Sequence, residues 1–163
     1  MEIVRFVKIF LVLCVGLWGL LGTIGNLSSL PDVYNEVREV TTMSGIPEDV
    51  GPPWRTANPI VVWAGVAFIV LGKLAALVGG GYGGLLMLKH VNAAPPEFNK
   101  SKKWAVAGCG LAFALMVFSF TIVAETAFFM FFTPRYEGAA ALAFRLAGSF
   151  ALITIFVAQP EPE

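Results

Sequence analysis

Charged residues are scarce in this sequence. Asp, Glu, Lys and Arg make up only 13% of the 163 residues, whereas 57% are hydrophobic and the formal net charge is zero. An ordinary soluble domain contains about 25% charged residues, and a chain of this length cannot enclose so much apolar surface in one soluble core. No block of basic residues indicates a nucleic-acid partner. The composition therefore excludes a soluble domain and predicts a protein whose main partner is the lipid bilayer.

The residues that catalysis and metal binding need are also scarce. His90 is the only histidine, so the chain alone cannot build a multi-histidine metal site or ligate a haem by two histidines. Cys14 and Cys109 each lie alone inside an apolar run, without CxxC or zinc-type spacing. Ser119 and Ser149 have no nearby base that would activate a nucleophile. We therefore expect no cofactor, no metal site and no enzymatic activity.

Strands are excluded by pattern, because no segment alternates polar and apolar residues with a period of two. The chain has long apolar runs instead, and a helix crosses the roughly 30 Å hydrocarbon core with about 20 residues. These runs predict an all-α polytopic membrane protein, a single-domain four-helix bundle with spans at about residues 6–27, 59–88, 104–132 and 139–158. The first run is longer than a signal-peptide core and no A-x-A-like site follows it, so we interpret it as an uncleaved span.

Lysine and arginine are unevenly distributed between the connecting segments. The N-terminal segment contains Arg5 and Lys8, and the loop at 89–103 contains four lysines. The loop at 28–58, by contrast, has two arginines against five acidic residues. This distribution predicts that both termini and the loop at 89–103 face the cytoplasm.

The loop at 28–58 is long for a connection without a role. Residues 33–38 could form a short amphipathic helix on the membrane surface, and the glycines and prolines at 45–53 interrupt regular structure after it. Trp54 and Arg55 precede the second span, where an aromatic residue is expected at the level of the lipid headgroups. We interpret Trp54 and Arg55 as an interface anchor, with a docking surface for another protein as the alternative.

Two glycine rows predict close helix packing. Small residues let helix backbones approach each other in lipid, where no hydrophobic force drives helices together. Glycine also weakens a helix by about 1 kcal/mol relative to alanine, so the glycine run of the second span is expected to soften or kink it. The residues expected at helix contacts are Gly16, Gly19, Gly22 and Gly25 in the first span, and Gly79, Gly80, Gly83 and Gly84 in the second.

Three ionisable residues, Lys73, Glu125 and Arg145, lie inside the apolar runs. Each costs a few kcal/mol near the centre of a bilayer when it has no partner. Counted inward from the predicted span ends, Glu125 and Arg145 lie about 12 and 9 Å from the same surface, so we expect an ion pair between them. Lys73 lies about 21 Å from that surface, and we expect no direct contact with Glu125. A functional relay and a site completed by another chain are the alternatives to a structural pair.

Several short motifs resemble those of a known family. They are Trp54-Arg55 before the second span, Glu125 ahead of a run of aromatic residues, Tyr136-Glu137-Gly138, Ala143-Phe144-Arg145, Ile155-Phe156-Val157-Ala158 and Pro160-Glu161. The family consists of uncharacterised bacterial small integral membrane proteins that share a domain of unknown function. Thr126 and Tyr136 depart from its usual Glu-Trp and Trp-Asn-Gly patterns. The resemblance implies four spans and supplies no activity.

Three functions fit these features. We expect a non-catalytic accessory or structural subunit of a larger membrane protein complex in the bacterial inner (cytoplasmic) membrane, because the chain is small, lacks cofactor ligands and has glycine-lined helices. The first alternative is a small oligomeric transporter or channel that uses Lys73, Glu125 and Arg145 along its path. The second is an enzyme subunit whose aromatic residues at 128–132 line a quinone or lipid site.

Overall fold

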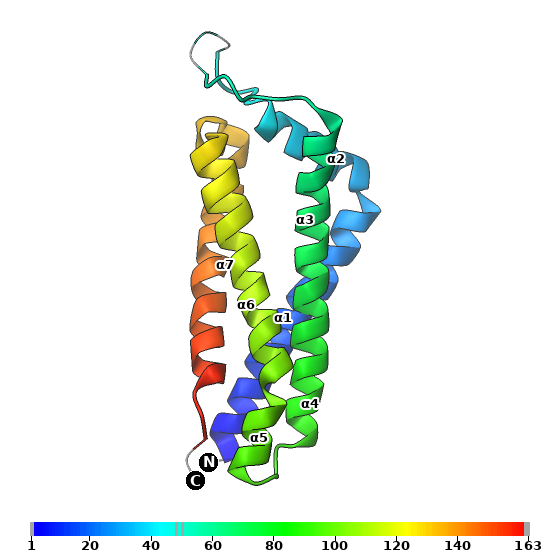
Figure 1. The fold of residues 1–163 in the computed structure, drawn as a ribbon, viewed down its shortest axis with the longest axis vertical. Helices are drawn as coiled ribbons and strands as arrows, with labels where there is room; N and C mark the ends of the chain where they lie inside the picture. Colours follow the sequence, from blue (N-terminus) through cyan, green and yellow to red (C-terminus); the bar gives the residue numbers. More distant parts are fainter. Residues whose placement is uncertain (1, 48, 50, 162–163) are drawn as a thin grey trace.

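Four long helical rods form an antiparallel bundle in the computed structural model, which describes residues 2–47, 49 and 51–161 (Figure 1). Both termini lie at one end, called here the terminal end, and the long connection between the first two rods lies at the other, the loop end.

The first rod is α1 (Glu2–Ser28), followed by the short helix α2 (Leu30–Thr41). The second consists of α3 (Pro59–Leu77), the π-helical segment η1 (Val78–Tyr82) and α4 (Gly83–Lys89). The third consists of α5 (Pro95–Ser101), α6 (Lys103–Leu115) and the π-helical segment η2 (Met116–Ala127), and after the 3₁₀ turn η3 (Met130–Phe132) the fourth rod is α7 (Pro134–Ala158).

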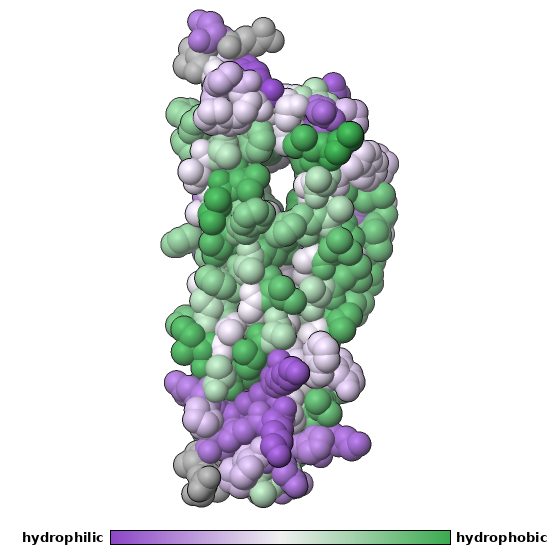
Figure 2. Space-filling view, viewed as in Figure 1, coloured by the Kyte–Doolittle hydropathy of each residue, from purple (hydrophilic) through white to green (hydrophobic). Residues whose placement is uncertain are grey.

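All four rods are long and apolar enough to cross a membrane, at Ile3–Ser28, Pro59–Lys89, Pro95–Ala127 and Arg135–Ala158. On the face shown in Figure 2, apolar side chains form a broad belt across the middle of the molecule, and polar side chains gather toward its ends. Every regular element in the described ranges is helical. The prediction of an all-α bundle with four spans is therefore confirmed.

The ends of two rods differ from the predicted spans. The third rod begins at Pro95, inside the segment 89–103 expected as a loop, and it ends at Ala127 rather than near residue 132. The fourth rod begins at Pro134 instead of residue 139. Both rods start with proline, which suits a first helical turn because its missing N–H has no partner to lose there. Phe129, with a φ of 50°, turns the chain between η2 and α7.

Glycines allow the first three rods to cross closely. A Cβ at Gly16 would lie 2.6 Å from the backbone nitrogen of Gly81, and a Cβ at Gly80 would lie 2.6 Å from that of Gly16. On the opposite side of the second rod, the backbones of Gly79 and Gly108 approach too closely for a side chain on either. Backbone-to-backbone contact on both sides therefore fixes the second rod between α1 and α6.

Most other glycines of the two rows also pack inside the chain. They contact the Leu77 backbone (Gly19), the Lys73 side chain (Gly22), the Ala105 backbone (Gly83) and the Leu13 side chain (Gly84). Gly25 differs, because a Cβ there would meet nothing within 4 Å. The expectation that Gly25 packs against a helix is therefore not met within this chain.

Two rods contain π-helical segments. The segment η1 coincides with the glycine run of the second rod, where the sequence predicted a weakened helix. The segment η2 extends over 12 residues, although π-helical hydrogen bonding usually occupies a single turn and frequently marks functional sites. The Ser119 hydroxyl donates to the carbonyl of Leu115, just before this segment. The third rod therefore departs from α-helical hydrogen bonding over a longer segment than the second rod does.

The best-packed core lies toward the terminal end. Val12 and Val15 of α1, Ala76 of α3, and Cys109 and Leu115 of α6 are all buried in one cluster. Toward the loop end α3 and the third rod diverge (Figure 1), and a cavity opens between them.

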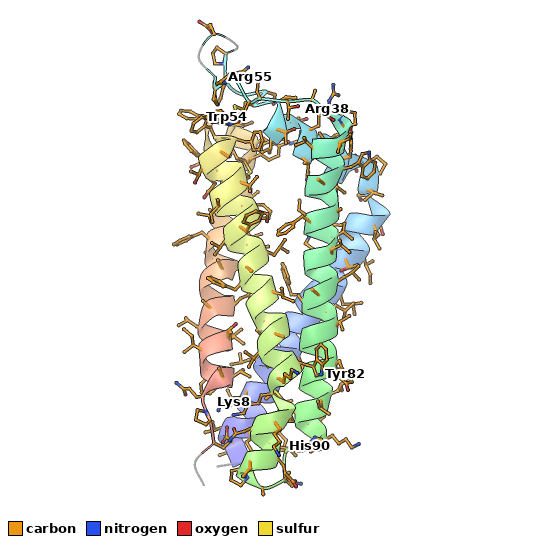
Figure 3. All side chains as sticks on the ribbon, in the orientation of Figure 1. Lys8, Arg38, Trp54, Arg55, Tyr82 and His90 are labelled. Atoms are coloured by element: carbon orange, nitrogen blue, oxygen red, sulfur yellow. The ribbon has the colours of Figure 1, made fainter. Side chains whose placement is uncertain are left out.

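The connection at the loop end is tied to the bundle by α2 and by Trp54. The Tyr34 ring of α2 lies 5.0 Å from the ring of Trp63 in α3, measured between centroids, so α2 rests on α3. Trp54 Nε1 donates to the carbonyl of Ala127 at 2.9 Å, and Arg55 Nη2 donates to that of Pro47 at 3.1 Å (Figure 3). Trp54 thus fastens the connection to the end of η2. Glu48, counted among the acidic residues of this loop, lies outside the described residues.

Candidate functional site

A cavity of about 470 Å³ lies in the loop half of the bundle, between α2, α3, η2 and α7. Pockets for small organic ligands typically measure about 300–1,000 Å³. Apolar side chains dominate its wall, among them Val37 of α2, Phe68 of α3, and Phe118 and Phe120 of η2. It opens as a hollow in the upper part of the apolar belt (Figure 2). A molecule dissolved in the membrane could therefore enter it from the side.

The floor of the cavity is polar. Lys73 lies about 21 Å from the start of α3 at Pro59, and its Nζ donates to Asn26 Oδ1 at 3.0 Å. Gly22 makes room for this side chain, since a Cβ there would lie 2.8 Å from Lys73 Cδ. Asn26 Nδ2 is buried without a hydrogen-bond partner, and so is the hydroxyl oxygen of Thr23, which lies three residues earlier on α1 and outside the cavity lining. Because buried polar groups are normally paired, the Asn26 amide leaves one hydrogen-bond donor of the floor unsatisfied.

The rim of the cavity toward the loop end is polar as well. The buried Tyr136 of α7 donates its hydroxyl to the Glu39 carboxylate of α2, and Arg135 Nη1 lies 3.4 Å from the same carboxylate. Glu36, also on α2, lines the cavity and is the one carboxylate among its described lining residues, as Lys73 is the one cation. No ion pair within 4.0 Å joins Glu36 to Lys73. The polar rim and the polar floor are thus separated by an apolar wall.

The ion pair predicted between Glu125 and Arg145 is not formed. Glu125 lies two residues before the end of η2 at Ala127, whereas Arg145 lies eleven residues after the start of α7 at Pro134. Because the third rod ends earlier and the fourth begins earlier than predicted, the two residues differ in depth by about 13 Å. The structure therefore brings together none of the three intramembrane charges Lys73, Glu125 and Arg145, and each has to be considered separately.

Arg145 is exposed on the outer surface of α7, near the middle of that helix. Its Nε donates to the carbonyl of Ala141 in the same helix at 3.3 Å, and the described residues offer it no carboxylate within 4.0 Å. The two glycines near Arg145 on this helix have no neighbours within the chain: a Cβ at Gly138 or Gly148 would meet nothing within 4 Å among the described residues. A guanidinium on this face would meet lipid chains unless another protein covers it.

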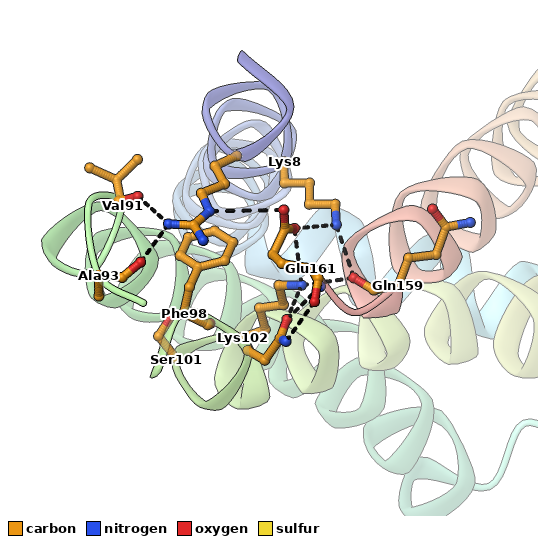
Figure 4. A network of polar contacts seen from close by, with 10 residues as sticks. Lys8, Val91, Ala93, Phe98, Ser101, Lys102, Gln159 and Glu161 are labelled. Carbon is orange, nitrogen blue, oxygen red and sulfur yellow. Dashed lines mark hydrogen bonds and ion pairs between the residues drawn. The ribbon is translucent and has the colours of Figure 1, made fainter. Parts of the chain in front are cut away.

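The terminal end carries a second polar site, the Glu161 cluster (Figure 4), which consists of Arg5, Lys8, Phe98, Asn99, Lys102, Gln159 and Glu161. Glu161 Oε1 accepts from Lys8 Nζ at 2.7 Å and from Lys102 Nζ at 3.3 Å, and Glu161 Oε2 lies 3.8 Å from Arg5 Nε. The side chains of Lys8 and Glu161 are each only 3% exposed. Three buried cations therefore converge on one buried carboxylate.

Backbone carbonyls complete the Glu161 cluster. Arg5 Nη1 donates to the carbonyls of Val91 and Ala93, both at 2.7 Å, and Lys8 Nζ donates to that of Gln159 at 2.9 Å. The guanidinium of Arg5 also lies 4.6 Å from the centroid of the buried Phe98 ring. The cluster thus connects the start of α1, the connection after α4 and the segment that follows α7.

The ionisation of Glu161 fits this environment. Burial raises the pKa of the Glu161 carboxyl, but the hydrogen bonds and positive charges of Lys8 and Lys102 outweigh burial and hold the pKa below its ordinary value of 4.5. The carboxylate therefore stays ionised at neutral pH and fastens the C-terminal segment to the terminal end.

The sequence pattern singled out Lys73, but it did not indicate the other residues that define the two polar sites. Arg5 and Lys8 stood out only as charges of a segment expected in the cytoplasm, and no role was predicted for Asn26 or Glu161. One available signal was the pair Thr23 and Asn26, two polar residues on one face of an otherwise apolar span. Nothing local distinguished Glu161, because its partners come from segments far away in the chain.

The chemistry of the cavity is that of a binding site. It offers aromatic and aliphatic walls for an apolar body, and an ammonium and an amide for a polar group. In the ranges that the structure describes, no group of three or more His, Cys, Asp or Glu residues could hold a metal ion.

Comparison with known proteins shows the family of this chain. The family model described as "Predicted small integral membrane protein" matches residues 4–160, a range that includes all four rods except the first two residues of α1. No curated protein and no solved structure matches the chain.

Proposed function

Since the chain belongs to this family of predicted small integral membrane proteins, we propose that it is a non-catalytic accessory subunit of a larger membrane protein complex. We place it as a multi-pass protein in the bacterial inner membrane, with the terminal end in the cytoplasm. The basic residues Arg5, Lys8, Lys89, Lys100, Lys102 and Lys103 near the terminal end support this orientation.

One observation carries the proposal, namely the outward-facing guanidinium of Arg145, about 16 Å from the start of α7. Charged residues inside spans almost always face a bundle interior or a water-filled cavity, and an arginine at a helix centre costs about 2.5–3.5 kcal/mol on insertion scales. To reach the headgroups from this depth the side chain would have to cross about half of the roughly 30 Å hydrocarbon core. A carboxylate of another membrane protein would remove this cost at the place where the arginine lies.

The surface around Arg145 suits a partner helix. Gly138, Ala141, Gly148 and Ser149 are small, exposed and spaced on the same side of α7 as Arg145. Small residues at such spacing let two helices in a membrane approach each other closely. The glycines of the first two rods are mostly occupied by contacts inside the chain. We therefore assign the partner surface to α7 rather than to those glycine rows.

Crosslinking in native membranes, followed by gentle purification and mass spectrometry, tests the proposal. We expect a second protein species to be retained by the wild type and lost from Arg145→Leu, since leucine no longer needs a charged partner and suits lipid. Arg135→Leu is the matched control, because Arg135 is exposed at the loop end and its contact is with Glu39 of the same chain. A monomer or a pure homo-oligomer recovered from native membranes would contradict the proposal.

Thiol labelling tests the orientation. In a variant without its two native cysteines, a cysteine at Lys100 should react only with reagents that enter the cytoplasm, and a cysteine at Ser44 should react with impermeant ones. Labelling in the opposite sense would reject the placement of the terminal end in the cytoplasm.

Transport by an oligomer is the second candidate, and the cavity favours it. The cavity is open to the surface in the loop half, and close glycine contacts between α1, η1 and α6 lie below it toward the terminal end. A transporter would have to separate these contacts to release a substrate on the other side. Lys73 would then contact the substrate, whereas Arg145 and Glu125 lie outside the cavity lining.

A further inference from the structure

The floor of the cavity has more hydrogen-bond donors than acceptors. Lys73 Nζ has three donor positions, and the described residues take up one of them, at Asn26 Oδ1. The amide nitrogen of Asn26, another lining residue, is buried and has no partner among them. A ligand that satisfies this floor therefore has to supply acceptors, and it has to do so beside a positive charge.

In the part of the chain that the structure describes, no anionic acceptor contacts Lys73 within 4.0 Å. Glu36 is the one carboxylate among the described lining residues, and it makes no ion pair with Lys73 within 4.0 Å. Ser119, another polar lining residue, already donates its hydroxyl to Leu115. The missing partner of Lys73 and Asn26 is thus an anionic oxygen group from outside the chain.

The wall above the floor determines the rest of the ligand. Along α3 the lining runs from Val61 to Lys73, a rise of about 18 Å. Phe68, Phe118 and Phe120 line this stretch, and the cavity opens to the surface within the apolar belt. A slender hydrocarbon chain fits such a wall and can enter from the membrane without crossing water.

We propose that this cavity binds a long-chain carboxylate, with its head on Lys73 Nζ beside Asn26 and its chain along the aromatic wall toward the loop end. The carboxylate would accept charge-assisted hydrogen bonds from the donor positions of Lys73 Nζ that Asn26 Oδ1 does not occupy. Moving a hydrocarbon chain from lipid into the cavity gains little, because lipid is equally apolar. The head group therefore decides the affinity and the specificity of the site.

Competition against a photoreactive hexadecanoate tests the assignment. The protein, purified in a neutral detergent, is labelled with a hexadecanoate that carries a diazirine on its chain, in the presence of unlabelled competitors. Hexadecanoate should compete at a concentration at least tenfold lower than hexadecanol, which has the same chain without the charge. Label should appear on the peptides that contain Phe68 and Phe118.

Four variants locate the head group. Lys73→Met removes the ammonium, and Asn26→Asp places a carboxylate of the same size beside Lys73, so each should weaken labelling at least tenfold. Glu36→Gln removes a like charge from the cavity and should strengthen or preserve labelling. Ser28→Ala is the matched control, because Ser28 lies outside the cavity lining and its hydroxyl donates to a carbonyl of its own helix, so it should change nothing. The buried Cys109 thiol should stay unreactive in every variant, which shows that the bundle is folded.

Three results would overturn the proposal. Equal competition by hexadecanol and hexadecanoate would mean that the cavity selects only apolar chains. Equal competition by acetate would mean that the chain is irrelevant. Undiminished labelling of Asn26→Asp, the variant least disturbing to the fold, would remove the assigned head-group site. None of these results depends on whether a partner protein covers Arg145.

Discussion

We expect loss of the negative charge of Glu161 to destabilise the terminal end more than loss of any other single charge there. Its carboxylate lies 2.7, 3.3 and 3.8 Å from nitrogens of Lys8, Lys102 and Arg5. With an effective dielectric constant of about 20, each contact is worth roughly 4–6 kcal/mol of gross Coulomb attraction. Desolvation and the mutual repulsion of the three cations offset most of this attraction. The net effect has to be measured by removing the carboxylate charge.

Glu161→Gln keeps the size of the side chain and one carbonyl acceptor but removes the charge. Breaking a buried ion pair by removing one partner typically costs about 3–5 kcal/mol, since the remaining charge stays buried without compensation. Because glutamine still accepts one hydrogen bond, we expect a loss of about 3 kcal/mol in the free energy of unfolding. The loss should appear first as release of the segment after α7, which Lys8 and Lys102 hold through the Gln159 carbonyl.

The buried Cys109 thiol provides the assay. In a Cys14→Ala background it is the only thiol, and it is fully buried, so its reaction with a maleimide during a denaturant titration reports unfolding. Glu137→Gln is the control, because Glu137 is an exposed glutamate in the first turn of α7. If Glu161→Gln unfolds at the same denaturant concentration as Glu137→Gln, the carboxylate does not hold the terminal end together.

Three further predictions follow from the described contacts. Because the Glu161 pKa is lowered in the folded protein, the stability that this carboxylate contributes is present above pH 4.5 and is lost as the pH falls below that value. Denaturant titrations of the wild type at a series of pH values should show this loss. A similar loss in Glu161→Gln would refute the prediction. Gly80→Leu should abolish folding, since a Cβ there would lie 2.6 Å from the Gly16 backbone, whereas Gly25→Leu should be tolerated. Gel filtration in detergent distinguishes a folded from an aggregated variant. Equal elution of the two variants would contradict the described packing. Trp54→Phe should destabilise the fold by about 1 kcal/mol through loss of its hydrogen bond to the backbone, measurable by thermal unfolding, and an unchanged midpoint would show that this contact contributes nothing.

The class of the protein could be predicted from the sequence alone. Four apolar runs with few charges indicate membrane-spanning helices. Inside lipid every backbone N–H and C=O group must be hydrogen-bonded within the protein, and a helix pairs all of them within one segment. The glycine rows likewise predicted close helix packing without showing which helices meet. A glycine leaves space beside its helix, and any neighbouring helix can occupy that space. Lys73, Glu125 and Arg145 stood out for the same local reason, because a charge in an apolar run is conspicuous.

The contacts that those residues make could not be predicted from the sequence, because they depend on how the helices pack. Glu125 and Arg145 were expected to pair, and a shift in where two rods begin and end separates them, because depth depends on helix ends that local sequence defines poorly. The donors of Lys73 and Asn26 share one cavity floor although 47 positions separate them in the chain. Glu161 is likewise joined to Lys8 across 153 positions. Such contacts depend on how whole helices cross, and the crossing is set by packing over many residues rather than by any motif near the residues that meet.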